Sequence, residues 1–204
     1  MAFLIASNQN NINTHVRSMI SLNDGKFTIV FDANPRISES NSVIYNSKSI
    51  PQLPTNINYF DNVSARVFSI SDIKFVSRTR QEASNNNQVI YHLRYLTKPN
   101  FGKEGNGLPP KIVTLNGFNP YTRDNSTGNN IPVPGPLGAI NSIPVVITSF
   151  EIDWPNDTDF IPDNDDTATP IIRTGSLTLL EIHSPKQISE FDLNKFFNGE
   201  LLGW

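Results

Sequence analysis

Several short stretches of the chain combine β-branched and aromatic residues in a way that predicts β-strands. Lys26 to Asp32 is such a stretch: it follows the turn signal Asn23-Asp24-Gly25 and ends before Asn34-Pro35. Residues 144–154 and 171–182 are longer and are joined by an acidic loop. We expect these two strands to cross a whole sheet.

A β-hairpin with a long tip is predicted over residues 63–96. Residues 63–70 and 72–80 are β-rich, a polar stretch of Ser and Asn follows, and residues 89–96 alternate between two faces. The polar face of this hairpin would make it a locally basic arm in an acidic protein, through Arg78, Arg80, His92 and Arg94.

The C-terminal pattern predicts a short helix followed by an apolar tail. Ser184-Pro185 supplies a helix cap and a proline at the first helical position, and Asn198-Gly199 is a stop signal. Free termini normally fray, so an apolar tail either folds back on its own core or docks into a neighbouring chain. The large apolar residues of the last nine positions are Phe196, Phe197, Leu201, Leu202 and Trp204.

The remaining segments are rich in Asn, Ser, Pro and Gly and are expected to be irregular. We expect an N-terminal arm over 1–25 and loop excursions over 33–62 and 97–142. The first excursion contains one short strand near 43–45, and the second contains one at 112–115. A loop of such length is usually a binding element. Neither a repeat nor a domain boundary interrupts the chain, which predicts a single domain over 1–204.

Composition favours an all-β protein with long Asn/Pro/Gly-rich loops. Charged residues make up 17% of the 204 residues, while there are 26 Asn, 19 Ser, 15 Pro and 11 Gly. A coiled coil would instead be rich in Ala, Glu, Lys, Leu and Arg. The 13 Phe, with Ile and Val spread along the chain, argue against disorder.

Charge and cysteine content exclude several functional classes. With a net charge of −3, the chain lacks the excess of positive charge that is typical of proteins that bind nucleic acid. With no cysteine, disulfides, iron–sulfur clusters, thiolate zinc sites and cysteine nucleophiles are impossible. The N-terminal apolar run is shorter than a signal sequence, and no stretch is apolar enough for a transmembrane helix. We therefore expect folding in a cytoplasm and no membrane partner.

An acidic segment joins the two long predicted strands. Closely spaced carboxylates can bind calcium, and Asp163, Asp165 and Asp166 are the weak candidates for such a site. Against calcium, the segment lacks the Gly and distal Glu of an EF-hand loop. The alternatives are a negatively charged surface and a solvated loop in which Asp and Asn form turns. The seven carboxylates are Glu151, Asp153, Asp157, Asp159, Asp163, Asp165 and Asp166.

The histidines give no catalytic motif, so we expect neither enzymatic activity nor a cofactor. His15, His92 and His183 are far apart, and the chain has no Gly-x-Ser-x-Gly elbow and no phosphate-binding glycine loop. Glu181 and His183 share a face of a predicted strand. No third partner for this pair is evident from the sequence.

The pattern over 147–204 resembles the tail-tube and baseplate-tube proteins of contractile-tailed bacteriophages. In that family a long strand ends at a step similar to Leu179-Leu180-Glu181-Ile182-His183-Ser184-Pro185. An aromatic-containing helix and a Gly-Leu turn then follow, matched here by Phe191, Phe196, Phe197, Gly199 and Leu201. The similarity covers a little over a quarter of the chain.

The resemblance implies a β-barrel or sandwich of the tail-tube type with a short C-terminal helix. Six copies would form a ring in the virion tail, assembled in the host cytoplasm. Genomic DNA would pass through the lumen without specific binding, and the partners would be tube, baseplate hub or sheath proteins. The acidic segment would meet the basic hairpin of a neighbouring copy, or would face the lumen and repel DNA.

Two roles are compatible with this resemblance, and one rival lies outside it. The long irregular stretches favour a baseplate-proximal initiator ring, since a junction must present different surfaces above and below. The alternative is the main repeating tube protein. The rival is a β-sandwich module that binds a carbohydrate or receptor, with Trp154 or Tyr121 stacking on a sugar ring.

Overall fold

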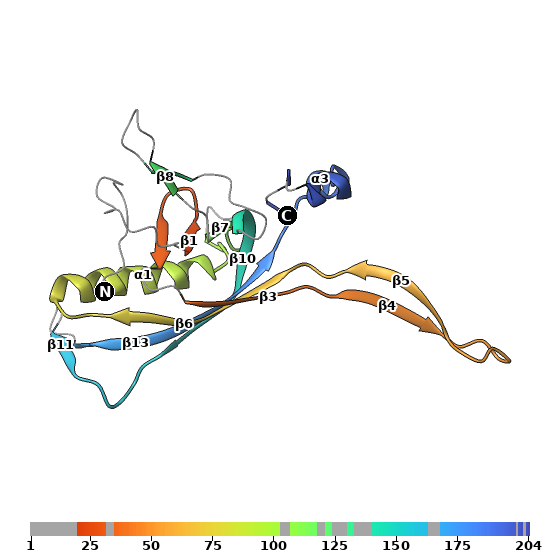
Figure 1. The fold of residues 1–204 in the computed structure, drawn as a ribbon. Coiled ribbons are helices and arrows are strands. Elements are labelled where there is room, and N and C mark those ends of the chain that lie inside the picture. The colour runs from red at the N-terminus through yellow and green to blue at the C-terminus, as the bar shows by residue number, and fades with distance from the viewer. Residues whose placement is uncertain are drawn as a thin grey trace.

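A seven-stranded antiparallel sheet forms the body of the protein in a computed structural model of the chain (Figure 1). The structure describes residues 20–31, 35–102, 107–117, 121–123, 130–132, 140–162, 168–198, 200, 201, 203 and 204. From one edge to the other, the strands are β2 (Thr28–Phe31), β1 (Ile20–Asn23), β7 (Val113–Gly117), β10 (Ile140–Asp153), β13 (Ile172–Glu181), β6 (Val67–Val76) and β3 (Arg36–Ser40).

The strongest strand predictions are confirmed. β10 and β13 pair antiparallel from Val145 opposite Glu181 to Asp153 opposite Thr174. β2 lies within the predicted strand at 26–32, and β7 overlaps the short strand predicted at 112–115. The described part of the chain is therefore mainly β and antiparallel, as the composition indicates.

A bulge in β6 changes which residues of that strand face the core. Phe68 and Ile70 are buried in its first half, whereas Ile73 and Phe75 are buried in its second. Asp72 adopts a positive φ of 60°, and the pairing with β13 shifts register at this point. The extra residue lets both halves of β6 present apolar side chains to the same core.

The hairpin prediction for 63–96 is wrong in its second half, because residues 80–96 form the helix α1 (Arg80–Leu96). Thr79 caps the helix: its Oγ1 accepts a hydrogen bond from the Glu82 amide at 3.2 Å, and the Glu82 carboxylate accepts one from the Arg78 amide at 2.7 Å. This Thr-x-x-Glu pattern is a helix-start signal present in the sequence.

The alternation seen over 89–96 also fits a helical period. Val89, Leu93 and Leu96 are buried together against the sheet, whereas Tyr91 is 75% exposed. A strand would have placed Tyr91 on the same face as Leu93. Spacings of three and four residues select one face of a helix, and the cap decides in favour of the helix.

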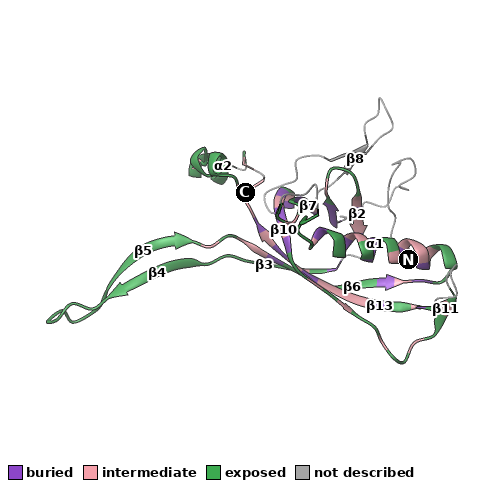
Figure 2. Cartoon of the chain, turned by 180° about the vertical axis from the view of Figure 1, so that it is seen from behind, coloured by how far each residue is buried: buried purple, intermediate pink, exposed green. Residues whose placement is uncertain are grey.

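The core lies between α1 and one face of the sheet. Apolar residues from β1, β2, β6, β7, β10, β13 and α1 form one buried cluster. Asn86 is a buried polar residue of α1 and donates hydrogen bonds to the Val76 carbonyl and the Ser77 hydroxyl. Figure 2 shows buried residues in the body and none along the ribbon that projects from it.

That ribbon corrects the prediction of a loop excursion over 33–62. The segment contains β3 and an antiparallel hairpin of β4 (Val43–Lys48) and β5 (Ile57–Val63). Both faces of this hairpin are exposed, so burial does not select one face as apolar. The Ser- and Asn-rich sequence therefore lacks the alternation of apolar and polar residues that would have predicted strands.

Two small hairpins complete the described strands. β8 (Tyr121–Arg123) pairs with β9 (Asn130–Pro132), inside the predicted excursion at 97–142. β11 (Phe160–Pro162) pairs with β12 (Ala168–Pro170) between the two long strands. The predicted N-terminal arm at 1–25 contributes β1 to the sheet, and residues 1–19 lie outside the described residues.

The predicted C-terminal helix starts where expected, but it is divided into two short helices, α2 (Pro185–Ser189) and α3 (Leu193–Phe197). Ser184 and Gln187 form a capping box at the start of α2. The Asp192 carboxylate then caps α3 by accepting from the Asn194 and Lys195 amides. Among the described residues, no helix has both the length and the hydropathy needed to cross a bilayer.

Candidate functional site

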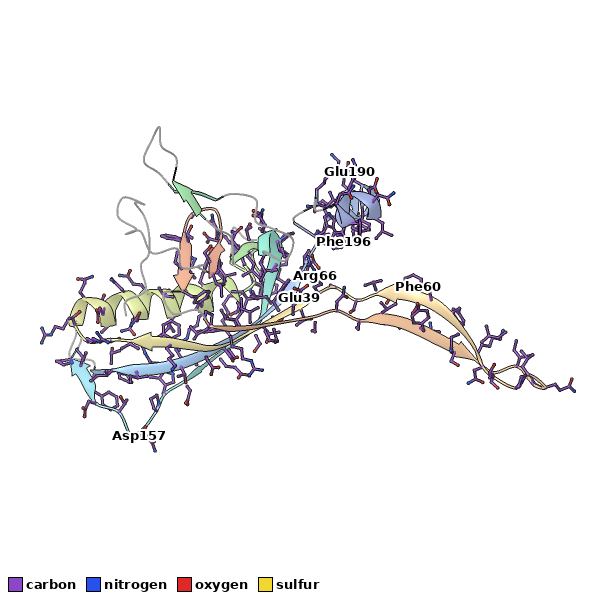
Figure 3. All side chains as sticks on the ribbon, in the orientation of Figure 1. Glu39, Phe60, Arg66, Asp157, Glu190 and Phe196 are labelled. Carbon is purple, nitrogen blue, oxygen red and sulfur yellow. The ribbon has the colours of Figure 1, made fainter. Side chains whose placement is uncertain are left out.

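The arm, defined here as residues 43–63, presents apolar side chains to solvent along its length (Figure 3). Each of its residues is exposed. Tyr45 is 62% exposed and Phe60 is 56% exposed, and their rings meet edge to face at 6.1 Å. The other large exposed apolar residues of the arm are Val43, Ile44, Ile50, Leu53, Ile57, Tyr59 and Val63.

Two hydrogen-bonded serines, Ser42 and Ser64, lie where the arm joins the body of the protein. The Ser64 amide donates to the Ser42 carbonyl at 2.9 Å, the Ser42 amide donates to the Ser64 hydroxyl at 3.1 Å, and the two hydroxyl oxygens are 2.7 Å apart. These contacts join the two sides of the ribbon where β3 gives way to β4. The base of the arm is therefore held in register with the sheet.

A hollow of about 830 Å³, here called the root pocket, lies between the base of the arm and the C-terminal helices. Val63 comes from the arm, Arg66 from the chain just before β6, and His183 from the chain after β13. The wall on the helix side is apolar and is lined by Ile188, Phe191, Phe196 and Trp204.

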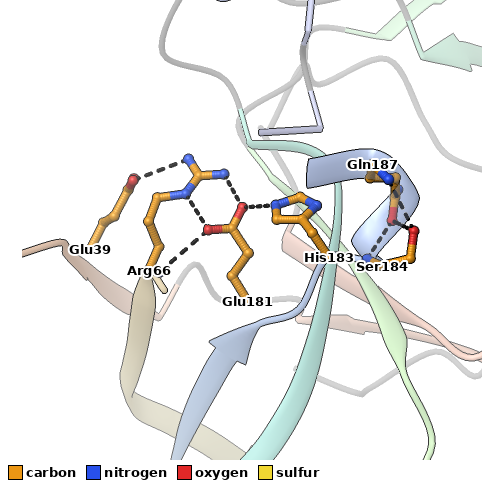
Figure 4. Close-up of polar contacts among 6 residues, drawn as sticks. All are labelled: Glu39, Arg66, Glu181, His183, Ser184 and Gln187. Atoms are coloured by element: carbon orange, nitrogen blue, oxygen red, sulfur yellow. Dashed lines mark hydrogen bonds and ion pairs between the residues drawn. The ribbon is translucent and has the colours of Figure 1, made fainter. Parts of the chain in front are cut away.

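An ion network lies beneath the root pocket (Figure 4). Arg66 donates to both carboxylate oxygens of Glu181, from Nε at 2.9 Å and from Nη2 at 2.6 Å. Its Nη1 donates to Glu39 Oε1 on β3 at 3.3 Å. His183 Nε2 lies 2.7 Å from Glu181 Oε1. The network thus links β3, β6, β13 and the connection to α2.

The network keeps Glu181 ionised. Burial of its carboxyl group opposes ionisation, but hydrogen bonds from Arg66 and His183 and their charges hold the pKa of Glu181 below its ordinary value of 4.5. Both carboxylate oxygens of Glu181 already have hydrogen-bond partners. Glu181 therefore holds Arg66 and His183 in place and is not free to act as a base. Arg66 is the third partner that the sequence did not reveal, because it lies 115 residues away from Glu181.

The apolar tail folds back in part onto this network. The Trp204 ring stacks on His183 with centroids 3.8 Å apart and an interplanar angle of 13°, and it also meets Phe191 at 4.7 Å. Phe196 lines the root pocket, whereas Phe197 is 82% exposed. The tail was expected either to fold back on its own chain or to dock into a neighbouring chain. Trp204 packs on its own chain, whereas Phe197 remains exposed on the surface.

The carboxylates of the acidic segment are spread over several elements. Glu151 and Asp153 are exposed at the end of β10, and Asp157 and Asp159 are exposed in the connection to β11. The calcium candidates Asp163, Asp165 and Asp166 lie outside the described residues. Among the residues that the structure describes, no three acidic or histidine side chains are grouped closely enough to hold a metal ion.

The arginines predicted to form a basic face are separated. Arg78 precedes the Thr79 cap of α1, Arg80 is the first residue of the helix, and Arg94 lies in its last turn. At about 1.5 Å per residue, Arg80 and Arg94 are about 21 Å apart along the helix axis. The basic hairpin arm is therefore not formed, and the arm that does project carries few charges.

A second hollow, of about 510 Å³, lies between α1 and β2 and is lined in part by Phe27, Tyr91 and Tyr95. His92 packs between Phe27 and Tyr95 and lies 3.4 Å from the Asp24 carboxylate. Burial opposes ionisation of Asp24, but the Phe27 and Lys26 amides, His92 and Lys111 hold its pKa below the ordinary value.

Comparison with known proteins adds no assignment to this geometry. No protein-family model matches the chain, and no curated protein matches it.

Proposed function

We propose that this chain is a structural subunit of a bacteriophage tail tube. Six copies form a ring at the baseplate end of the tube, and DNA passes through its lumen. The resemblance over 147–204 suggests this role, and the exposed apolar arm is the observation that supports it most directly. The protein acts in the virion tail without catalysis and without a cofactor.

An arm of this kind requires a partner. An isolated two-stranded hairpin is marginally stable in water, and monomeric proteins rarely expose a long apolar surface. The arm contributes none of the buried core residues. A second chain that covers Tyr45 and Phe60 therefore supplies the stability that the body does not provide.

The edges of the sheet offer a way to close a ring. Among the described strands, β2 and β3 are the outer ones. β10 pairs with β7 only over 140–145, so among the described strands its far half, 146–153, pairs on one side only, with β13. Edges left open in this way favour pairing with another chain. In a ring, each edge meets a different edge of the next copy.

The sheet face opposite α1 suits a conduit for DNA. Leu177 and Leu179 point to the core, so Ser176 and Thr178 lie on the other face, where Glu151 pairs with Ser176. The face also carries Lys74, opposite Thr174, and Arg36, opposite Ser71. Because Lys and Arg bind phosphates whereas hydroxyl groups and carboxylates do not attract them, the acidic end of β10 is the part of this face that suits a lumen. We place Glu151 and Asp153 at the lumen.

The test is the mass of the protein in solution and its appearance by negative-stain microscopy. We expect rings with about six times the 22.8 kDa of one chain. Replacing residues 43–63 by an Asn-Gly turn should leave a folded body, because Ser42 and Ser64 already face each other, but it should abolish the rings. Tyr91→Ser, on the exposed face of α1, is the matched control. A wild-type chain that stays monomeric at high concentration contradicts the proposal.

Two other roles predict different results in the same experiment. The main repeating tube protein should polymerise into long stacks, whereas an initiator ring should stop at one layer until tube subunits are added. A β-sandwich module that binds a carbohydrate or receptor is favoured by the aromatic hollow at Phe27, Tyr91 and Tyr95, since sugar rings stack on such surfaces. Such a module should remain a small monomer or trimer.

A further inference from the structure

The tip of the arm carries no charge and exposes two large apolar side chains among polar ones. Residues 49–56 contain no charged side chain, and Ile50 and Leu53 are exposed there, each directly before a proline. Gln52 adopts a positive φ of 74°, which turns the chain sharply. The nearest charge is that of Lys48, at the end of β4.

The root pocket has the complementary chemistry. Its walls are apolar and aromatic, and Arg66 on its floor is already paired with Glu181. Glu39 lies among its lining residues, and its side chain remains 47% exposed. Glu39 Oε1 already accepts from Arg66, but the carboxylate remains half-exposed beside an apolar hollow and can also meet one lysine beside an uncharged tip.

We propose that the root pocket of one copy holds the arm tip of a second copy, with Ile50 and Leu53 against the aromatic wall and Lys48 facing Glu39. This inference rests on the proposed function, because it requires copies of the chain to assemble.

A chain cannot fill its own pocket in this way. Val63, at the base of the arm, lines the pocket, and Ile57 begins β5 six residues earlier. At about 3.3 Å per residue, the tip lies about 20 Å or more from the pocket. Figure 3 shows the arm extended away from Phe196 and the C-terminal helices. The tip therefore reaches only the pocket of another copy.

The aromatic hollow between α1 and β2 is a poorer match for the tip. Its neighbouring carboxylate, Asp24, is only 2% exposed and already contacts His92 and Lys111. Lys48 would therefore meet Lys111 rather than an exposed carboxylate. Since the tip and the root pocket are different surfaces, their contact is heterologous and orders the copies head to tail.

Cysteine cross-linking tests the contact cleanly because the native chain has no cysteine. Leu53→Cys chains are mixed with Ile188→Cys chains and treated with a short bis-maleimide. Ile188 is an exposed residue of the pocket wall. The control replaces the second chain by Tyr91→Cys, which labels the other hollow. We expect cross-linked dimers with Ile188→Cys, at least ten times as abundant as with Tyr91→Cys.

The outcomes separate this inference from the proposed function. Rings without the Leu53–Ile188 cross-link, or with an equal yield at Tyr91→Cys, overturn the tip contact and leave the ring proposal in place. A monomeric wild type that does not cross-link overturns both. As a second measurement, Lys48→Glu should raise the concentration needed for assembly about tenfold, whereas Lys98→Glu, exposed just after α1, should not change it. Equal effects of the two variants contradict the pairing of Lys48 with Glu39.

Discussion

Single residues at the base of the arm determine how the C-terminal helices are held. The Arg66–Glu181 pair is largely buried and has two direct contacts. Removing one partner of such a pair leaves an uncompensated charge, which is costlier than losing the attraction itself.

Glu181→Gln should lower the free energy of unfolding by about 3 kcal/mol at neutral pH. The control is Glu190→Gln, because Glu190 is exposed and its contact with Lys186 is a surface pair. Chemical denaturation measures both. A loss below 0.5 kcal/mol, in the range expected of the surface pair, would show that the network is not structural.

The same pair predicts how acid affects stability. The pKa of Glu181 is lower in the folded chain, so its contribution is complete above the unfolded value of about 4.5 and is lost as the pH falls through the folded pKa. Wild-type stability should therefore fall more steeply than that of Glu181→Gln below about pH 4.5. Parallel curves for the two proteins contradict this assignment.

Gly175 lies at a point in the sheet where neighbouring atoms leave little room for a side chain. A Cβ at this position would lie 3.1 Å from the Glu151 carbonyl oxygen and 3.3 Å from Phe75. Gly175→Ala should cost about 1–3 kcal/mol through overpacking. Gly117→Ala is the control, since its Cβ would meet Ile20 at an ordinary 3.4 Å. Equal thermal melting temperatures of the two variants are the contrary result.

At the scale of elements, α1 shows how a cap selects between two periodicities. Thr79→Ala removes the hydroxyl that accepts from the Glu82 amide and should cost about 1 kcal/mol. Thr55→Ala, at the exposed arm tip, should be neutral for folding. Urea denaturation distinguishes them. An unchanged midpoint for Thr79→Ala would mean that packing alone holds the helix.

Some elements were predictable because their signals are local. Hydrophobic runs and turn residues predict β10, β13 and β2, and Ser184-Pro185 predicts the start of α2. The arm was missed because its exposed apolar residues follow no one-sided pattern. Residues 89–96 fit both periods, so their alternation alone predicts a strand, and the Thr79 cap is the local signal that distinguishes the helix.

At the scale of the whole molecule, the proposed ring predicts how charge affects DNA passage. Glu151→Lys with Asp153→Lys should leave assembly intact, because both residues are exposed on the face opposite α1, but the rings should then retain DNA. Co-sedimentation with duplex DNA at increasing salt measures this, and retention should fall steeply with salt. If the substituted rings do not co-sediment with DNA, Glu151 and Asp153 do not lie in the lumen.

The amino-acid sequence by itself determined the mainly β character, the two long central strands and the capped C-terminal helix. It did so because turn residues, caps and runs of β-branched side chains act over a few neighbouring positions. Tertiary structure alone decided that Arg66 meets Glu181 and Glu39, that Trp204 stacks on His183, and that residues 43–63 project as an arm. These contacts join residues far apart in the chain. Which distant groups meet is set by how the sheet is ordered and registered, and no local pattern encodes that.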